Sequence, residues 1–174
     1  MNHNTKKLVV SALMAAISCI ATMIIKIPVP ATGGYINLGD GAVILSGFML
    51  GPLYGGAAAG IGSALADIFS GYAIYAPATF IIKAVMAAAA SIIIKKSPKL
   101  FMLRVLTAGV ICEIIMAVGY LAFEGFILGY GAGALAAVVG NAIQGVCGIV
   151  VSAFLVPASY KLNSKAIVHN GSYK

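Results

Sequence analysis

Six apolar runs, separated by glycine, proline and small clusters of charge, occupy this chain almost from end to end. An α-helix rises about 1.5 Å per residue, so about 20 apolar residues cross the hydrocarbon core of a bilayer. Only 9% of the 174 residues are charged, whereas a soluble domain carries about 25% charged residues. The chain is therefore predicted to be an integral membrane protein, which argues against a soluble enzyme or a nucleic-acid-binding domain.

The apolar runs predict an all-α fold, a compact bundle of six transmembrane helices, because they lack the alternation that a membrane β-barrel needs. The second run is too short to cross alone, and Gly51-Pro52 separates it from the third. We expect one membrane domain over residues 1–162 and a polar cytoplasmic tail over residues 163–174. The expected helices cover residues 7–25, 41–51, 53–70, 76–95, 100–122 and 132–160.

The basic residues predict the orientation of this bundle. With six spans they fall on one side of the membrane, which the positive-inside rule makes cytoplasmic, so both termini are expected inside. They lie before the first run, around the fourth connection and after the last run: Lys6, Lys7, Lys95, Lys96, Lys99, Arg104, Lys161, Lys165 and Lys174.

Four polar residues interrupt the apolar runs: Lys83, Glu113, Asn141 and Gln144. An ionisable group at mid-membrane costs roughly 2.5–3.5 kcal/mol, so such residues need a partner or water. Counted along their helices, the first three share one depth below the outer boundary. They predict a cavity open to the outside. The alternative is a buried Lys–Glu pair and an amide contact that serve packing alone.

The connection over residues 26–40 mixes Pro, Gly, Tyr and Asn, which is typical of an ordered lid, although a plain surface connection has a similar composition. Tyr35 and Tyr75 lie near the predicted outer boundary, where tyrosines close over a ligand or form an interfacial belt. Asp40 and Asp67 are expected at outer helix ends, with Asp40 capping a helix start.

The motifs of common enzymes are missing from this sequence: it has no phosphate-binding loop, metal cluster or nucleophile elbow, and no cofactor is expected. The chain also shows no inverted repeat of the kind that builds a self-sufficient transporter, so a solute carrier of this type needs another protein to supply energy. Ala12 and Ala16 give the first helix a small-residue face that serves either ordinary packing or docking of a partner helix.

Several stretches resemble the substrate-binding S components of energy-coupling factor vitamin transporters: GYINLGD at residues 34–40, LGP at 50–52, Ala66-Asp67, and YAPATFIIK at 75–83. The nearest subgroup is the riboflavin type, which also includes hydroxymethylpyrimidine and pyridoxine carriers. The resemblance implies a vitamin pocket beneath the loop between the first two helices, in a protein of the bacterial cytoplasmic membrane. It also implies a transmembrane coupling subunit, docked on Ala12 and Ala16, and two cytoplasmic ATPases as partners.

On this reading, the buried Lys83 and Glu113 form a pair that opens to meet ring substituents of the vitamin. Asn141 and Gln144 hydrogen-bond the ring, Tyr35 and Asn37 close the lid, and Asp67 and Tyr75 complete the binding site. Two rival interpretations are a stand-alone proton-coupled transporter that uses Glu113, and a structural membrane subunit that binds no small molecule. The sequence leaves open whether the vitamin is hydroxymethylpyrimidine, pyridoxine or riboflavin.

Overall fold

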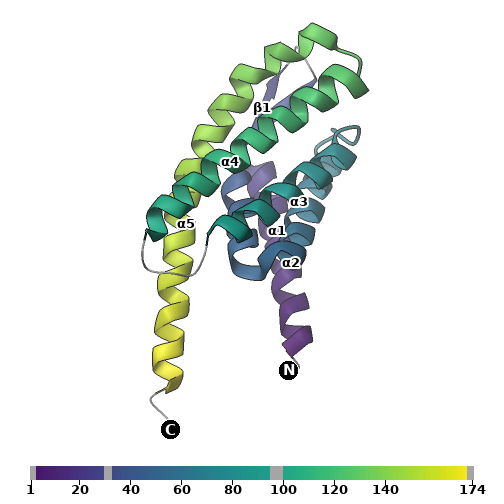
Figure 1. The fold of residues 1–174 in the computed structure, drawn as a ribbon. Helices are drawn as coiled ribbons and strands as arrows, with labels where there is room; N and C mark the ends of the chain where they lie inside the picture. The colour runs from purple at the N-terminus through teal and green to yellow at the C-terminus, as the bar shows by residue number, and fades with distance from the viewer. Residues whose placement is uncertain (1–2, 30–32, 95–99, 172–174) are drawn as a thin grey trace.

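Helices form nearly all of the chain, because a backbone in lipid must satisfy its own hydrogen bonds. The computed structural model describes residues 3–29, 33–94 and 100–171. A β-hairpin stands at one end of the helices (Figure 1). In order the elements are α1 (His3–Ile24), β1 (Lys26–Val29), β2 (Gly34–Asn37), α2 (Asp40–Phe69), α3 (Ala76–Ile93), α4 (Phe101–Ala122), the π-helical η1 (Phe123–Ile127), the 3-10 helix η2 (Gly131–Ala137) and α5 (Val138–Gly171).

The chain reverses direction inside α2, at Gly51-Pro52. Gly51 has φ 84° and ψ −179°, a backbone conformation that glycine adopts readily and other residues rarely do. The Ser46 hydroxyl donates a hydrogen bond to the Gly55 carbonyl at 3.0 Å, although nine residues of straight helix would separate them by about 13 Å. The two halves of α2 therefore fold back on each other, which confirms the predicted break.

Among the described residues, five helices are long and apolar enough to cross a membrane. The bounds of α1, α3 and α4 agree with the predicted runs to within a few residues. The last run differs more, since it begins with η2 and continues as α5 to Gly171, through most of the predicted tail. The candidate spans are Thr5–Ile24, Asp40–Phe69, Ala76–Ile93, Phe101–Ile127 and Gly131–Leu162.

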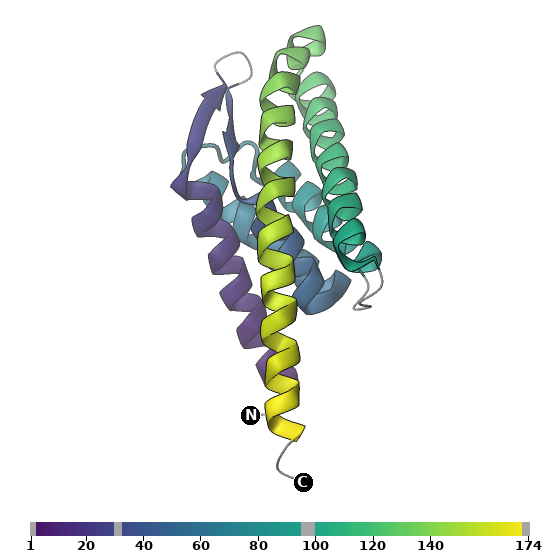
Figure 2. The ribbon, with the colours of Figure 1, turned by 90° about the vertical axis from the view of Figure 1, so that its left-hand side faces the viewer.

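A β-hairpin connects α1 to α2, and the apolar runs did not predict it. β1 and β2 pair antiparallel, with Lys26 opposite Asn37 and Pro28 opposite Tyr35. A two-stranded ribbon tolerates Pro28, because a proline without an N–H can face an unpaired edge. The hairpin contacts α1 and α5 at the end of the molecule opposite the termini (Figure 2). The expected lid is thus an ordered element.

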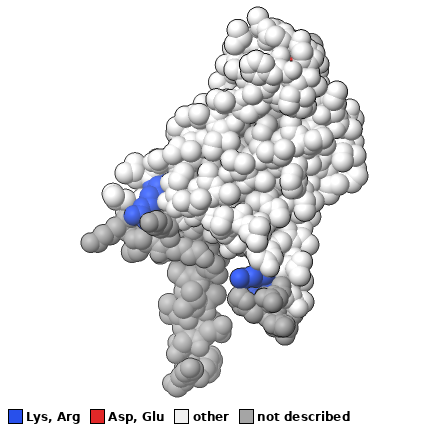
Figure 3. All heavy atoms as spheres, turned by 45° about the vertical axis from the view of Figure 1, so that its right-hand side comes forward, with Lys and Arg blue, Asp and Glu red and all other residues white. Residues whose placement is uncertain are grey.

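Both chain ends lie at the same end of the molecule (Figures 1 and 2). On the face drawn in Figure 3, the basic side chains of the described residues gather toward that end, and the broad middle of the surface is uncharged. Lys95, Lys96, Lys99 and Lys174, together with the side chain of Lys165, lie outside the described residues.

The outside of the bundle is as apolar as its inside. Leu53 is 76% exposed and Phe126 is 88% exposed, a pattern that suits contact with lipid rather than water. The core lies between α2, α3, α4 and α5, where Ile44, Met86 and Met116 are completely buried. Polar groups inside such a bundle need a structural or functional reason.

Candidate substrate-binding site

Most of the buried polar residues gather directly beneath the hairpin, around a small cavity. Its volume is about 30 Å³, which is room for water-sized molecules only. A larger ligand therefore needs the hairpin to move outward. The lining comes from the hairpin, α2, α3, α4, η1, η2 and α5: Val29, Gly34, Tyr35, Asn37, Asp67, Tyr75, Thr79, Tyr120, Glu124, Ala137 and Asn141.

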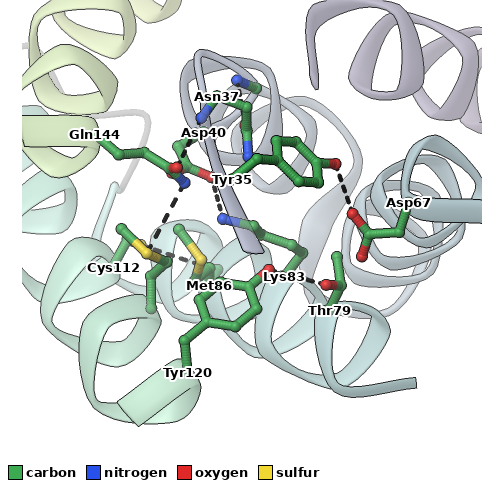
Figure 4. Close-up of polar contacts among 12 residues, drawn as sticks. Tyr35, Asn37, Asp40, Asp67, Thr79, Lys83, Met86, Cys112, Tyr120 and Gln144 are labelled. Atoms are coloured by element: carbon green, nitrogen blue, oxygen red, sulfur yellow. Dashed lines mark hydrogen bonds and ion pairs between the residues drawn. The ribbon is translucent and has the colours of Figure 1, made fainter. Parts of the chain in front are cut away.

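One wall of the cavity joins the hairpin to the second half of α2. The Tyr35 hydroxyl donates a hydrogen bond to Oδ1 of Asp67 at 2.5 Å (Figure 4), and the Tyr35 ring packs on Tyr72 with centroids 4.5 Å apart. Burial raises the pKa of Tyr35, and the neighbouring Asp67 raises it further, so the hydroxyl stays a donor. The other carboxyl oxygen of Asp67 is buried without a hydrogen-bond partner among the described residues.

The opposite wall comes from α3, the end of α4 and η1. The Tyr75 hydroxyl donates to Oε1 of Glu124 at 3.1 Å, and the hydroxyls of Thr79 and Tyr120 lie 2.9 Å apart. Glu124 is 3% exposed and lies in the π-helical turn η1, a distortion that is frequent at functional sites.

The predicted site did not include Thr79, Tyr120 or Glu124. Tyr120 was expected near the outer boundary, among tyrosines that close over a ligand or form an interfacial belt. Thr79 precedes Lys83 by four residues and so lies on the same face of α3, which is a signal that could have found it. Glu124 has no such signal, since it stands at the end of an apolar run, where a charge is expected to meet water. Its burial depends on the π-turn that redirects the chain after α4.

A charged network adjoins the cavity through Asn37, which lines it. The Lys83 ammonium forms an ion pair with Asp40, and both side chains are almost fully buried. Gln144 donates from Nε2 to Oδ2 of Asp40 at 2.6 Å and accepts at Oε1 from the Asn37 backbone N–H at 2.8 Å (Figure 4). The network therefore joins α2, α3 and α5 to strand β2. We call Asp40, Lys83 and Gln144 the floor network.

Two expectations about this network need correction. Asp40 is no outer helix cap: it is fully buried, and Asn37 accepts the Gly39 N–H at the start of α2 instead, at 2.9 Å. The expected Lys83–Glu113 pair is also not formed, because Asp40 takes the ammonium of Lys83. A buried lysine requires an anion, but the sequence could not show which of four acidic residues folds against it.

Glu113 lies beside the floor network. It is 7% exposed, and neither carboxyl oxygen has a hydrogen-bond partner among the described residues. Two glycines of α5 make room for it. A methyl group at Gly145 would lie 3.1 Å from the Glu113 Cβ, and one at Gly148 would lie 2.9 Å from the Asp40 Cβ. Glu113 is thus a second buried acid next to Asp40.

The predicted site residues are therefore divided between two levels. Tyr35, Asn37, Asp67, Tyr75 and Asn141 line the cavity. Lys83 and Gln144 lie below it in the floor network, with Glu113 at its side. Of Lys83, Glu113 and Asn141, which were expected at a common depth, Asn141 is the one among the described lining residues of the cavity.

A second, apolar cavity is lined by α1 and the later half of α2, which pack against each other. Its volume is about 730 Å³. Both predicted docking residues, Ala12 and Ala16, lie on it, and Ala57 and Ala58 face them from α2. We call this feature the alanine groove.

The fold and the site define a multi-pass membrane protein with a polar cavity closed at one end by a hairpin. Residues 2–161 match the family described as ECF-type riboflavin transporter, S component, where ECF stands for energy-coupling factor. The chain belongs to this family, and it is a substrate-binding membrane subunit of an ECF transporter.

Two further comparisons find similar proteins. An uncharacterized protein from the gap 3' region of Pyrococcus woesei is 36% identical over 132 residues, which cover 76% of this chain and 86% of that protein. The solved structure of the S component of a bacterial ECF transporter matches with a TM-score of 0.66 and 22% identity, over 94% of this chain and 99% of that one. The second comparison shows a shared fold.

Proposed function

We propose that this chain captures a vitamin or vitamin precursor in the cavity beneath the hairpin, for uptake by an ECF transporter. The candidates are a hydroxymethylpyrimidine-like or pyridoxine-like molecule, or riboflavin. The supporting observation is a polar cavity inside an apolar bundle, with a hairpin held over it by the bond between Tyr35 and Asp67. Polar groups buried in lipid are costly, and this arrangement gives them a use.

We propose six membrane segments, with each half of α2 counted separately, and both termini in the cytoplasm of a bacterial cell. The chain reversal at Gly51 supports the count, and the termini and exposed basic residues gather at one end of the molecule. The cavity beneath the hairpin then faces the outside.

In this proposal the two levels of the site have different roles. Tyr35 and Asn37 form the lid, while Asp67, Tyr75 and Asn141 contact the ligand. Lys83, Glu113 and Gln144 were expected to bind the ligand as well. Because Lys83 and Gln144 are engaged with Asp40, we assign these residues to the floor that positions the wall above it.

Native mass spectrometry of the purified protein tests this proposal, followed by titration with hydroxymethylpyrimidine, pyridoxine and riboflavin. Wild type is compared with Asn141→Ala, and Thr107→Ala is the matched control because its hydroxyl bonds only to Leu103 O on the exposed side of α4. We expect one tight ligand, weakened about 5- to 150-fold by Asn141→Ala alone. A folded protein that binds none of the three contradicts the proposal.

The alanine groove is the proposed docking surface for the transmembrane coupling subunit, which works with two ATPases. Its lining is almost entirely apolar and rich in alanine, and small residues let helices approach closely. Ala12→Leu and Ala16→Leu should abolish uptake in cells and leave ligand binding intact. Leu13→Phe is the control, since Leu13 is 58% exposed and lies outside the groove.

The buried carboxyl group of Glu113 favours a second candidate, a stand-alone proton-coupled transporter. Intramembrane acids without partners often carry protons in such proteins. The two candidates differ in energy source. Uptake that needs ATP hydrolysis by partner subunits supports the ECF assignment, and uptake by the purified chain alone, driven by a proton gradient, supports the alternative.

A further inference from the structure

The wall of the cavity carries an imbalance between acidic and basic groups. Asp67 and Glu124 both line it, and both are 3% exposed. Among the described residues that line the cavity, none is Lys, Arg or His. Lys83 is engaged with Asp40 below, and the Lys26 ammonium donates to the Ser70 hydroxyl at 2.9 Å.

The hydroxyl groups around the cavity donate to one another or to these acids. Tyr35 donates to Asp67, Tyr75 donates to Glu124, and Thr79 and Tyr120 share a hydrogen bond. Asp67 lines the cavity, and its Oδ2 is buried without a hydrogen-bond partner among the described residues. The Tyr35 hydroxyl lies 2.5 Å from Oδ1 of Asp67, so that oxygen is already engaged.

We infer that the ligand of this cavity is a heteroaromatic amine whose amino group donates to Asp67, and that it carries no acidic group. This inference rests on the proposed function and narrows its substrate class. A buried, unpaired carboxylate gains most from a ligand that brings a donor or a positive charge. A phosphate or carboxylate would instead meet two acids across a low-dielectric cavity.

The aromatic walls suit the same ligand. Tyr35 and Tyr72 pack with centroids 4.5 Å apart on one side, and Tyr75 and Tyr120 lie 6.4 Å apart on the other. Tyrosine rings stack on flat heterocycles, and their faces attract cations. The tyrosine rings therefore favour a ligand that is both flat and positively charged or rich in hydrogen-bond donors.

The test is calorimetric titration of the detergent-purified protein with matched probes. Hydroxymethylpyrimidine with its amino group is compared with the analogue that has a hydroxyl group there, and pyridoxamine is compared with pyridoxine. The phosphate ester of each amine and riboflavin complete the panel. We expect at least one amine to bind about tenfold or more tightly than its hydroxyl partner, and its phosphate ester to show no binding.

Variants of the two wall acids, Asp67 and Glu124, test which of them recognises the amine. Asp67→Asn keeps the shape of the side chain and should remove most of the preference for the amine, whereas binding of the hydroxyl partner changes little. Glu124→Gln is a second variant that lowers the negative charge of the wall without touching Asp67. Thermal unfolding of each variant establishes that it is folded.

The outcomes separate this inference from the proposed function. Tight binding of riboflavin or of a phosphate ester overturns the inference. So does an equal loss of affinity for the amine and its hydroxyl partner in Asp67→Asn. In either case the proposed function, capture of a solute, still stands. A folded wild-type protein that binds no member of the panel overturns both.

Discussion

Two polar regions lie within this membrane bundle, one above the other, and they differ in how their charges are matched. In the floor network, Lys83 neutralises Asp40, and Gln144 satisfies the remaining oxygen. In the cavity wall, one oxygen of Asp67 has no hydrogen-bond partner among the described residues. Matched buried groups hold a structure together, whereas unmatched groups at a cavity are available to a ligand. The following predictions test this contrast.

Lys83→Met should have the largest effect, and the effect should be on stability. The substitution leaves the Asp40 charge buried without its cation, and breaking a buried pair in this way costs about 3–5 kcal/mol. Thermal unfolding in detergent measures the loss. The double variant Lys83→Met with Asp40→Asn should recover part of it. An unchanged midpoint together with lost ligand affinity would place Lys83 in the binding surface instead.

Gln144→Leu should uncouple the hairpin from the floor. It removes the acceptor of the Asn37 N–H and the second donor to Asp40, and an unsatisfied buried group costs about 1–3 kcal/mol. Hydrogen exchange at the Asn37 amide should accelerate, and the ligand should dissociate faster. Exchange as slow as in wild type would show that Gln144 does not hold the hairpin.

Tyr35→Phe should affect binding more than stability. The variant keeps the ring that packs on Tyr72 but loses the hydroxyl bound to Asp67. One hydrogen bond is worth about 1 kcal/mol, so ligand affinity should fall by about fivefold. Tyr72→Phe serves as the control, because its ring contact is kept. A large drop in unfolding temperature for Tyr35→Phe would contradict the proposed division of roles.

Glu113→Gln should have the smallest effect on stability. The carboxyl group makes no hydrogen bond within the described chain. An amide of the same shape therefore loses no hydrogen bond, and it removes the repulsion between Glu113 and Asp40. We expect the unfolding temperature to stay the same or to rise. A marked fall would reveal that the charge of Glu113 is needed, and loss of proton-driven uptake would favour the stand-alone transporter.

The fold could be read from the sequence because its causes are local. Apolar runs define helices in lipid, and Gly51-Pro52 marks the reversal in α2. The hairpin could not be predicted, because each strand has only four residues and β1 contains a proline. Its pairing depends on residues outside the helices, for which hydropathy gives little signal.

The site could be predicted only in part, for a physical reason. A polar residue within an apolar run can be recognised from the sequence as a candidate site residue, as Lys83, Glu113 and Gln144 can. Asp40 and Glu124 stand at the ends of runs, where a charge is expected to meet water, and only the packing of distant helices buries them. Which acid pairs with Lys83 is therefore a property of the tertiary structure.

The most direct test of this account is a high-resolution structure of the protein with its ligand bound. We predict a ligand between Tyr35, Asp67 and Asn141, with the hairpin shifted outward and the Lys83–Asp40 pair intact below. A ligand that contacts Lys83 and displaces Asp40, or one that lies in the alanine groove, would contradict the account.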